Sequence, residues 1–246
     1  MIKCDTGAVV VNKPCGVSTE TVVDWLQHAP PEEVREEIAR QKPGLELEPE
    51  LEPEPEYVLE SVSRLDKPTS GVLIVPLSRA VADFLTGQFK SRSVEKTYLC
   101  LCSGVAPTTG QFDAKLRTLS RGRGSKTAPH PQGKEALTEY RRLAVYQSRE
   151  QTAEPAEPAR FSLCEVSPRT GRTHQIRAHF AHGGHPLAGD VKYGGATVGG
   201  CTEDRLFLHS ARLRFAGVGG DQHDVSAELP PELTAVLDGL VKLDDE

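Results

Sequence analysis

The chain has 246 residues, of which 37% are hydrophobic and 26% are charged, and its net charge is −6. No apolar run approaches the roughly 20 residues of a membrane helix, and the N-terminus lacks the apolar core and cleavage site of a signal peptide. We therefore expect a soluble globular protein with its six cysteines reduced, intracellular and in the first place cytoplasmic, with the nucleus and organelles as alternatives. The length suits one domain over residues 1–246, with a single core or two lobes that share a cleft, and we expect a monomer.

Acidic residues are concentrated in two segments of the chain. Residues 32–60 hold 11 acids and 3 bases, and residues 221–246 hold 8 acids and 1 base. The rest of the chain keeps 16 acids and 25 bases. Because the local field decides whether phosphate is attracted, the negative net charge does not exclude a nucleic-acid partner. Ordinary segregation of charge explains the pattern equally well.

The N-terminal part predicts a strand and two helices before an acidic loop. Gly7–Val11 is typical of a short buried strand, and Asn12–Gly16 of a turn. Ser18–Gln27 predicts a helix, and Pro31 followed by two glutamates predicts the start of another. Residues 43–56 are rich in proline and glutamate, which cannot form a packed helix, so we expect an extended or disordered acidic loop there.

Beyond this loop the pattern alternates between strands and helices. Tyr57–Val62 and Val72–Pro76 predict strands that flank a polar loop, and Ser78 predicts the cap of a helix. Thr97–Ser103 alternates as a strand, whereas residues 107–134 are rich in glycine, proline and basic residues. The remaining predicted elements are strands at 138–146, 160–167, Leu206–His209 and Ala211–Phe215, a helix His174–His182 capped by Thr173, and a helix from Pro231. Strands outnumber helices in mixed order, which indicates an α+β fold with a largely antiparallel sheet.

The polar loop between the two predicted strands contains Asp66 between two basic residues, Arg64 and Lys67. The neighbouring positive charges favour an ionised carboxylate, and an anionic carboxylate can act as a nucleophile. The spacing alone favours the alternative, an aspartate that caps the turn at Thr69–Gly71.

A second polar segment is Ser167–Arg177. Gly171 permits a sharp turn, and Arg172, Thr173 and the start of the predicted helix bring hydrogen-bond donors together, as a phosphate or carboxylate would require. The alternative is a basic, solvated helix face. His174, His179, His182 and His185 have a spacing that resembles metal ligands, but no cysteine or carboxylate lies within the run to complete a tetrahedral site.

Taken together and in order, several segments resemble the RluA-type family of RNA pseudouridine synthases. They are VVNKPCGV at Val10–Val17, SRLDKPTSGVL at Ser63–Leu73, KTYL at Lys96–Leu99, TGRTHQIRAH at Thr170–His179, GHPLAGD at Gly184–Asp190, Tyr193 with Gly194, LHSA at Leu208–Ala211, and Leu229 with Pro230. Each motif alone is weak, but the ordered set runs through nearly the whole chain.

The resemblance implies an enzyme that isomerises uridine to pseudouridine in ribosomal or transfer RNA. It implies the pseudouridine synthase fold, a mixed and mainly antiparallel sheet with flanking helices and a central active-site cleft. The family uses neither a metal nor an organic cofactor, so we expect none here. The target base must leave the base stack before the enzyme can act on it.

The resemblance also implies residue roles. Asp66 corresponds to the catalytic aspartate, Tyr98 to the tyrosine that packs against the uracil and could accept the C5 proton, and Arg177 to the arginine that pairs with the aspartate. Arg64 corresponds to the arginine that can fill the space left by the flipped base. The other residues expected to bind RNA or substrate are Lys96, Arg172, His174 and Ile176.

The chain departs from the family pattern in two places. Ser63 replaces the histidine that precedes Arg-Leu-Asp, and we expect a stand-alone catalytic domain without the S4-like domain that many relatives carry. Two other functions stay open. One is a catalytically inactive RNA-binding protein on the same fold, which Ser63 favours, and the other is a metal-dependent hydrolase that uses the histidines.

Overall fold

The computed structural model describes residues 3–5, 7–41, 59–121, 124–149 and 158–243. The predicted acidic loop at 43–56 lies outside the described residues. The chain forms two compact units, Met1–Glu95 with Arg212–Ala227, and Lys96–Ala211 with Glu228–Glu246. Among the described residues, no helix combines the length and the apolar character needed to cross a bilayer.

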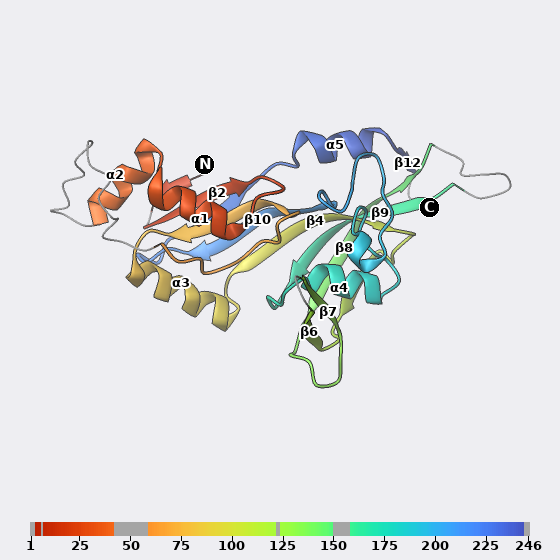
Figure 1. The fold of residues 1–246 in the computed structure, drawn as a ribbon, viewed down its shortest axis with the longest axis horizontal. Helices are drawn as coiled ribbons and strands as arrows, with labels where there is room; N and C mark the ends of the chain where they lie inside the picture. Colours follow the sequence, from red (N-terminus) through yellow and green to blue (C-terminus); the bar gives the residue numbers. More distant parts are fainter. Residues whose placement is uncertain (1–2, 6, 42–58, 122–123, 150–157, 244–246) are drawn as a thin grey trace. The chain divides into compact units, whose positions relative to one another are not determined.

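The first unit is built on antiparallel strands with helices packed on them (Figure 1). β1 (Lys3–Asp5) pairs with β2 (Ala8–Lys13), and β2 pairs with β3 (Ser70–Pro76), so that Val10 lies opposite Ile74. β10 (Leu208–Ala216) enters this unit at residue 212 and pairs with β11 (Gln222–Ser226). The helices are α1 (Thr19–His28), α2 (Glu32–Gln41) and α3 (Arg79–Ser91).

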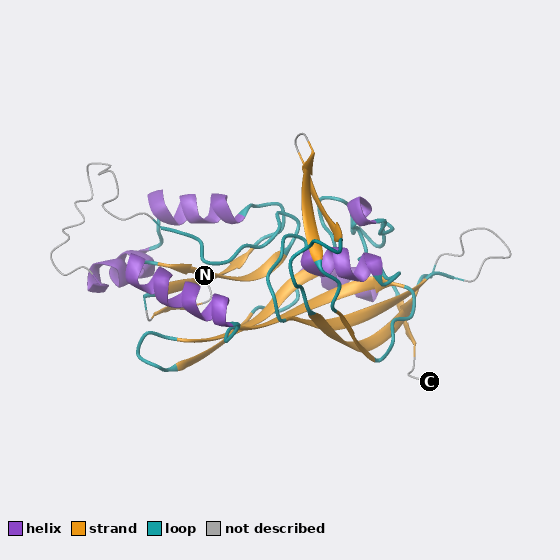
Figure 2. Ribbon diagram, turned by 90° about the horizontal axis from the view of Figure 1, so that it is seen from below, coloured by secondary structure: helices purple, strands orange, loops and turns teal. Residues whose placement is uncertain are grey.

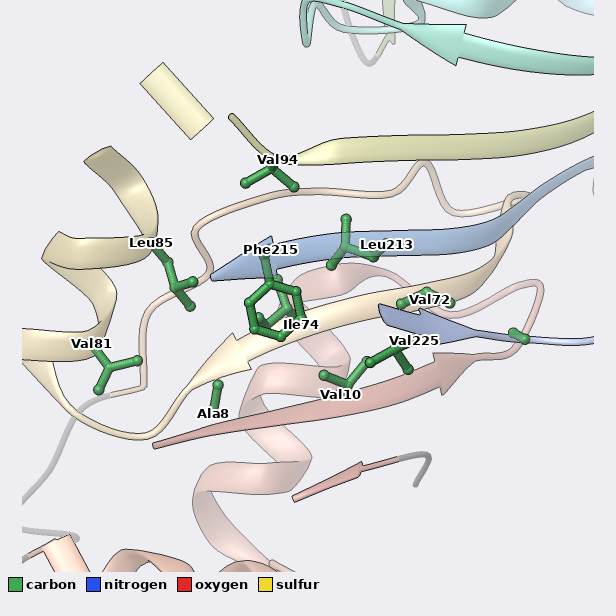
Figure 3. Packing of buried hydrophobic residues seen from close by; sticks show 11 residues of the cluster. Ala8, Val10, Val72, Ile74, Val81, Leu85, Val94, Leu213, Phe215 and Val225 are labelled. Carbon is green, nitrogen blue, oxygen red and sulfur yellow. The ribbon is translucent and has the colours of Figure 1, made fainter. Parts of the chain in front are cut away.

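The core of the first unit lies between α3 and the strands. In Figure 3, Val81 and Leu85 of α3 lie beside Ile74 of β3 and Phe215 of β10, and all four side chains are buried. The cap residues Ser18 and Ser78 accept hydrogen bonds from the backbone N–H groups of the first turns of α1 and α3. The predicted cap of α3 at Ser78 is therefore confirmed, whereas α1 begins at Thr19, one residue after the predicted start at Ser18.

The main strands of the second unit pair in the order β4 (Glu95–Ser103), β9 (Arg160–Pro168), β8 (Thr138–Gln147) and β12 (Val241–Leu243), and these pairs are antiparallel. β5 (Thr109–Phe112) also pairs with β8. In this register, Tyr98 on β4 lies opposite Val166 on β9. α4 (Gln175–His182), α5 (Pro231–Asp238) and a 3₁₀ turn, η1 (Val191–Tyr193), complete the unit.

A two-stranded hairpin, β6 (Leu116–Arg121) and β7 (Gly124–Pro129), forms a separate sheet in the second unit. Figure 2 shows these strands as a narrow ribbon that stands out from the helices of the unit. Sequence analysis predicted no strands at 107–134, because the glycines, prolines and basic residues there resemble a loop. The base of the hairpin packs against α4 through Leu116 and Ala178.

The predicted strand Tyr57–Val62 is wrong for its described part, since residues 59–62 are not in a strand. The backbone N–H of Leu59 instead donates to the side-chain oxygen of Gln27 on α1, at 2.7 Å. The strands predicted at Leu206–His209 and Ala211–Phe215 are one strand, β10. The α+β class and the largely antiparallel pairing are confirmed.

Candidate active site

Asp66 lies half-buried in the first unit, on the irregular segment that leads into β3. The residue before it, Leu65, is held by Thr19 of α1. The hydroxyl of Thr19 accepts the backbone N–H of Leu65 at 3.1 Å and donates to the Leu65 carbonyl at 3.2 Å. After it, the backbone N–H of Thr69 closes a turn on the Asp66 carbonyl at 2.9 Å. The backbone on both sides of the carboxylate is therefore fixed.

Lys13, at the end of β2, holds the same segment through hydrogen bonds. Its side chain is completely buried, and its ammonium group donates to the carbonyls of Pro14, Val17 and Lys67 at 2.9, 2.7 and 3.4 Å. The backbone N–H of Gly16 also donates to the Lys67 carbonyl, at 2.9 Å. A buried ammonium group is stable only when its N–H donors are hydrogen-bonded. Here these hydrogen bonds connect the segment 13–17 to the Asp66 loop.

Two other side chains of the loop differ in exposure. The Arg64 guanidinium is largely exposed, at 69%, and lies 3.8 Å from Glu20. A surface pair of this length contributes little to stability, so Arg64 can change partner at low cost. In contrast, Thr69 is buried, and its hydroxyl has no hydrogen-bond partner among the described residues.

The predicted site residues of the second unit lie on β4, on α4 and in the turn that precedes α4. Tyr98 on β4 is partly buried and packs against the apolar cluster that contains Ile176 and Phe180 of α4. Ile176 is only 6% exposed, so it belongs to the core behind Tyr98. Lys96, also on β4, donates to the Thr170 carbonyl at 3.3 Å.

α4 begins at Gln175, so the predicted start at His174 and the predicted Thr173 cap are wrong. The Gln175 side chain replaces a cap. Its oxygen accepts the Thr170 hydroxyl at 2.7 Å and the Arg172 backbone N–H at 3.0 Å, while its amide donates to Leu137 and Thr138 at 3.0 Å. Arg172 donates its Nε to the Glu135 carbonyl at 3.0 Å.

Arg177 is buried on α4, so the alternative of a solvated basic helix face is wrong. Its Nε and Nη2 atoms each donate to a different oxygen of Asp190, at 2.8 Å. Asp190 is 1% exposed, and the ring of Tyr193 lies 5.1 Å from the Arg177 guanidinium carbon. Planar two-point pairing of this kind fixes the orientation of an arginine as well as its charge.

Three histidines of the run from 174 to 185 make hydrogen bonds within the fold. His174 hydrogen-bonds Tyr193, His179 hydrogen-bonds Thr138 and the Ala114 carbonyl, and His185 hydrogen-bonds the Ser103 carbonyl. Burial lowers the pKa of His179, with a further contribution from His182. Within the described residues, no three His, Cys, Asp or Glu side chains gather closely enough to hold a metal ion.

Basic residues lie along the β6–β7 hairpin, which packs beside α4. Arg117 and Lys126 are exposed on its strands, and Lys115 at its base pairs with Glu135 at 2.8 Å. Such a row of solvated cations on a narrow projecting hairpin suits contact with a phosphate backbone.

A family model described as RNA pseudouridylate synthase matches residues 7–182, which include both the Asp66 loop and α4. The chain belongs to this family. The resemblance recognised from the ordered motifs is therefore confirmed at the level of the family.

Several pseudouridine synthases are similar to the chain in sequence. The tRNA pseudouridine synthase C of Haemophilus ducreyi is 36% identical over 63% of the chain and 65% of its own length. The ribosomal large subunit pseudouridine synthase C of Vibrio parahaemolyticus is 33% identical over 75% of the chain and 56% of its own length. The matches thus span less than two thirds of either relative.

A solved structure, human RNA pseudouridylate synthase domain containing 1, is similar in fold. It is 25% identical, with a TM-score of 0.66 over 98% of this chain and 87% of that one. The predicted pseudouridine synthase fold is therefore confirmed.

Three residues that support the site were not predicted as site residues: Lys13, Asp190 and Tyr193. All three lie within motifs that carry the family resemblance: Lys13 in VVNKPCGV, Asp190 in GHPLAGD, and Tyr193 in the pair Tyr193 with Gly194. Their positions in those motifs were the only available signal, because their buried contacts join segments far apart in the sequence.

Proposed function

We propose that the chain is an RNA pseudouridine synthase that isomerises uridine in tRNA or ribosomal RNA, with Asp66 as its catalytic carboxylate. The observation that carries the proposal is the fixed backbone around Asp66, which Thr19 holds on one side and Lys13 and Gly16 hold on the other. A reacting group held in this way loses little entropy when it meets its substrate. The names of the relatives support tRNA and ribosomal RNA as candidate substrates.

The reaction breaks the N-glycosidic bond of uridine, turns the uracil, and forms a new bond through C5. An ionised Asp66 can either attack C1′ or remove the 2′ proton to give a glycal, and both routes need the carboxylate in its charged form. Tyr98 offers an aromatic face to the extruded uracil and is the candidate base for the C5 proton. We assign Arg177 a catalytic role on the motif and on its buried, fixed charge.

RNA binding is assigned to basic residues that are exposed or partly exposed. Arg64 can stack in the space left by the flipped base, which offsets part of the few kcal/mol that flipping costs. Lys96, Arg172 and His174, with the basic residues of the β6–β7 hairpin, are proposed to contact phosphates or sugars. Ile176 acts indirectly, as part of the core behind Tyr98.

The proposal is tested by release of tritium from RNA labelled at uridine C5, because isomerisation must expel that hydrogen. Wild type, Asp66→Asn and the surface control Asp24→Asn are incubated separately with total tRNA and ribosomal RNA. We expect release by wild type and by the Asp24 variant, and none by the Asp66 variant. If wild type binds RNA but releases no tritium from either pool, and Ser63→His releases none, the chain is a non-catalytic RNA-binding protein.

A further inference from the structure

The guanidinium of Arg177 is held by two side chains that follow α4 in the sequence. Asp190 accepts two hydrogen bonds of 2.8 Å from it, and the Tyr193 ring lies 5.1 Å from its central carbon. With Asp190 1% and Arg177 6% exposed, water cannot replace either contact. The two hydrogen bonds define the plane of the guanidinium, and the ring adds a cation–π contact.

Tyr193 is in turn held by the β6–β7 hairpin and by the start of α4. Its hydroxyl accepts the backbone N–H of Thr127 on β7 at 2.9 Å and hydrogen-bonds Nδ1 of His174 at 2.9 Å. Lys126, the neighbour of Thr127, lies 5.4 Å from the same ring. The position of the ring against Arg177 therefore depends on where the hairpin places β7.

The backbone conformation of His174 is a second observation that links this arrangement to function. Its φ is 52°, in the left-handed region that side chains other than glycine rarely adopt. Such a conformation persists only where surrounding contacts enforce it, and it is common at functional sites. Here it brings the imidazole to the Tyr193 hydroxyl, edge-on to the ring.

We propose that Asp190 and Tyr193 are positioning residues that fix Arg177 for the synthase reaction, and that Tyr193 makes this dependent on the β6–β7 hairpin. The inference rests on the proposed function, because it takes Arg177 to act in catalysis. The inference goes beyond that function because it gives the β6–β7 hairpin a second role in addition to RNA contact. RNA that engages the hairpin also secures the tyrosine that backs the catalytic arginine.

The first test is a double-mutant cycle measured by tritium release. Asp190→Asn removes the charge and one acceptor but keeps the shape, and we expect kcat to fall about 100-fold with KM changed little. Arg177→Lys keeps a positive charge but cannot form the two-point pair. In the Arg177→Lys background, Asp190→Asn should lower kcat by no more than about twofold further, since Asp190 acts through the arginine.

The second test separates the hydroxyl of Tyr193 from its ring. Tyr193→Phe keeps the ring on Arg177 and loses both hydroxyl contacts, so kcat should fall about tenfold, whereas Tyr193→Leu should cost more. The matched control is Tyr146→Phe, which removes the same hydroxyl from a tyrosine of β8 that packs against a different core cluster. This control should leave both kcat and KM within about twofold of wild type.

The outcomes distinguish this inference from the proposed function. If wild type releases no tritium, the proposed function fails. If wild type is active and Asp66→Asn is not, but Asp190→Asn and Tyr193→Phe keep wild-type kcat, only the positioning role fails. It also fails if Asp190→Asn costs as much in the Arg177→Lys background as in wild type, or if the variants lower Tm without changing kcat. Should Asp190→Asn not fold, Tyr193→Phe with its control Tyr146→Phe decides the question.

Discussion

A single hydroxyl, that of Thr19 on α1, satisfies both backbone groups of Leu65, the residue before Asp66. It accepts the Leu65 N–H at 3.1 Å and donates to the Leu65 carbonyl at 3.2 Å. Both residues are buried, so water cannot take over either bond. Helix α1 thereby sets the position of the proposed catalytic loop.

Thr19→Val should therefore lower both stability and activity. It leaves two buried backbone groups of Leu65 without partners, which we expect to reduce the free energy of unfolding by about 2–4 kcal/mol in urea titrations. With the loop loosened, kcat for tritium release should fall while KM stays near its wild-type value. Thr19→Ser is the control, because it keeps the hydroxyl. Equal losses in the two variants would show that the methyl group matters and the hydrogen bonds do not.

Local signals in the sequence were sufficient to predict the helices that begin at a cap. Ser78 precedes apolar residues at helical spacing, and α3 starts directly after it as predicted, while α1 starts at Thr19, one residue after the predicted Ser18. The described part of the strand predicted at Tyr57–Val62 is not a strand, although the predicted segment is rich in apolar residues. Its hydrogen-bond partner is the side chain of Gln27, and no local pattern records such a contact.

Prediction of the site was limited in the same way. The Asp66 loop was found from its motif, but its supports were not, since Lys13 acts on a carbonyl 54 residues away. The predicted Thr173 cap is absent, because no side chain caps the first turn of α4 and the Gln175 side chain accepts the Arg172 N–H before the helix instead. The roles of Asp190 and Tyr193 depend on buried contacts with Arg177, which sequence spacing does not indicate.

Gln175 should be a major contributor to the stability of the second unit. All four hydrogen bonds of its side chain are to groups of the 137–138 and 170–172 segments, and the residue is 5% exposed. Gln175→Leu removes the partners of all of them, so we expect the free energy of unfolding to fall by about 3 kcal/mol or more. The exposed Gln132→Leu should change it by no more than about 0.5 kcal/mol. A loss for Gln175→Leu as small as that of the control would contradict the network.

Thr69 is expected to respond in the opposite direction. Its hydroxyl is buried without a partner among the described residues, so the folded state bears a desolvation cost that valine would avoid. Thr69→Val should raise the free energy of unfolding by about 1 kcal/mol and leave kcat unchanged. Thr138→Val, which removes a buried hydroxyl bonded to Gln175 and His179, should lower it instead. A loss of stability in Thr69→Val would mean that its hydroxyl is bonded in solution, for example to an ordered water.

His179 should make the protein less stable as the pH falls. Burial lowers its pKa below the ordinary value of 6.5, with a smaller contribution from His182, against the opposing effects of the Ala114 carbonyl and Asp113. Because a carbonyl only accepts, Nε2 carries the proton given to Ala114, and Nδ1 accepts from the Thr138 hydroxyl. The neutral ring is the form that the fold stabilises.

The sign of the pH dependence follows from this depressed pKa. Below pH 6.5 the unfolded chain binds a proton that the folded chain does not, so stability falls with pH until the folded-state pKa is reached, by at most about 1.4 kcal/mol per pH unit. Urea titrations between pH 7.5 and about pH 5 should show this slope in wild type and in the control His130→Gln, and a smaller slope in His179→Gln. If His179→Gln keeps the full wild-type slope, another group is responsible for it, and the neutral His179 is not what low pH disrupts.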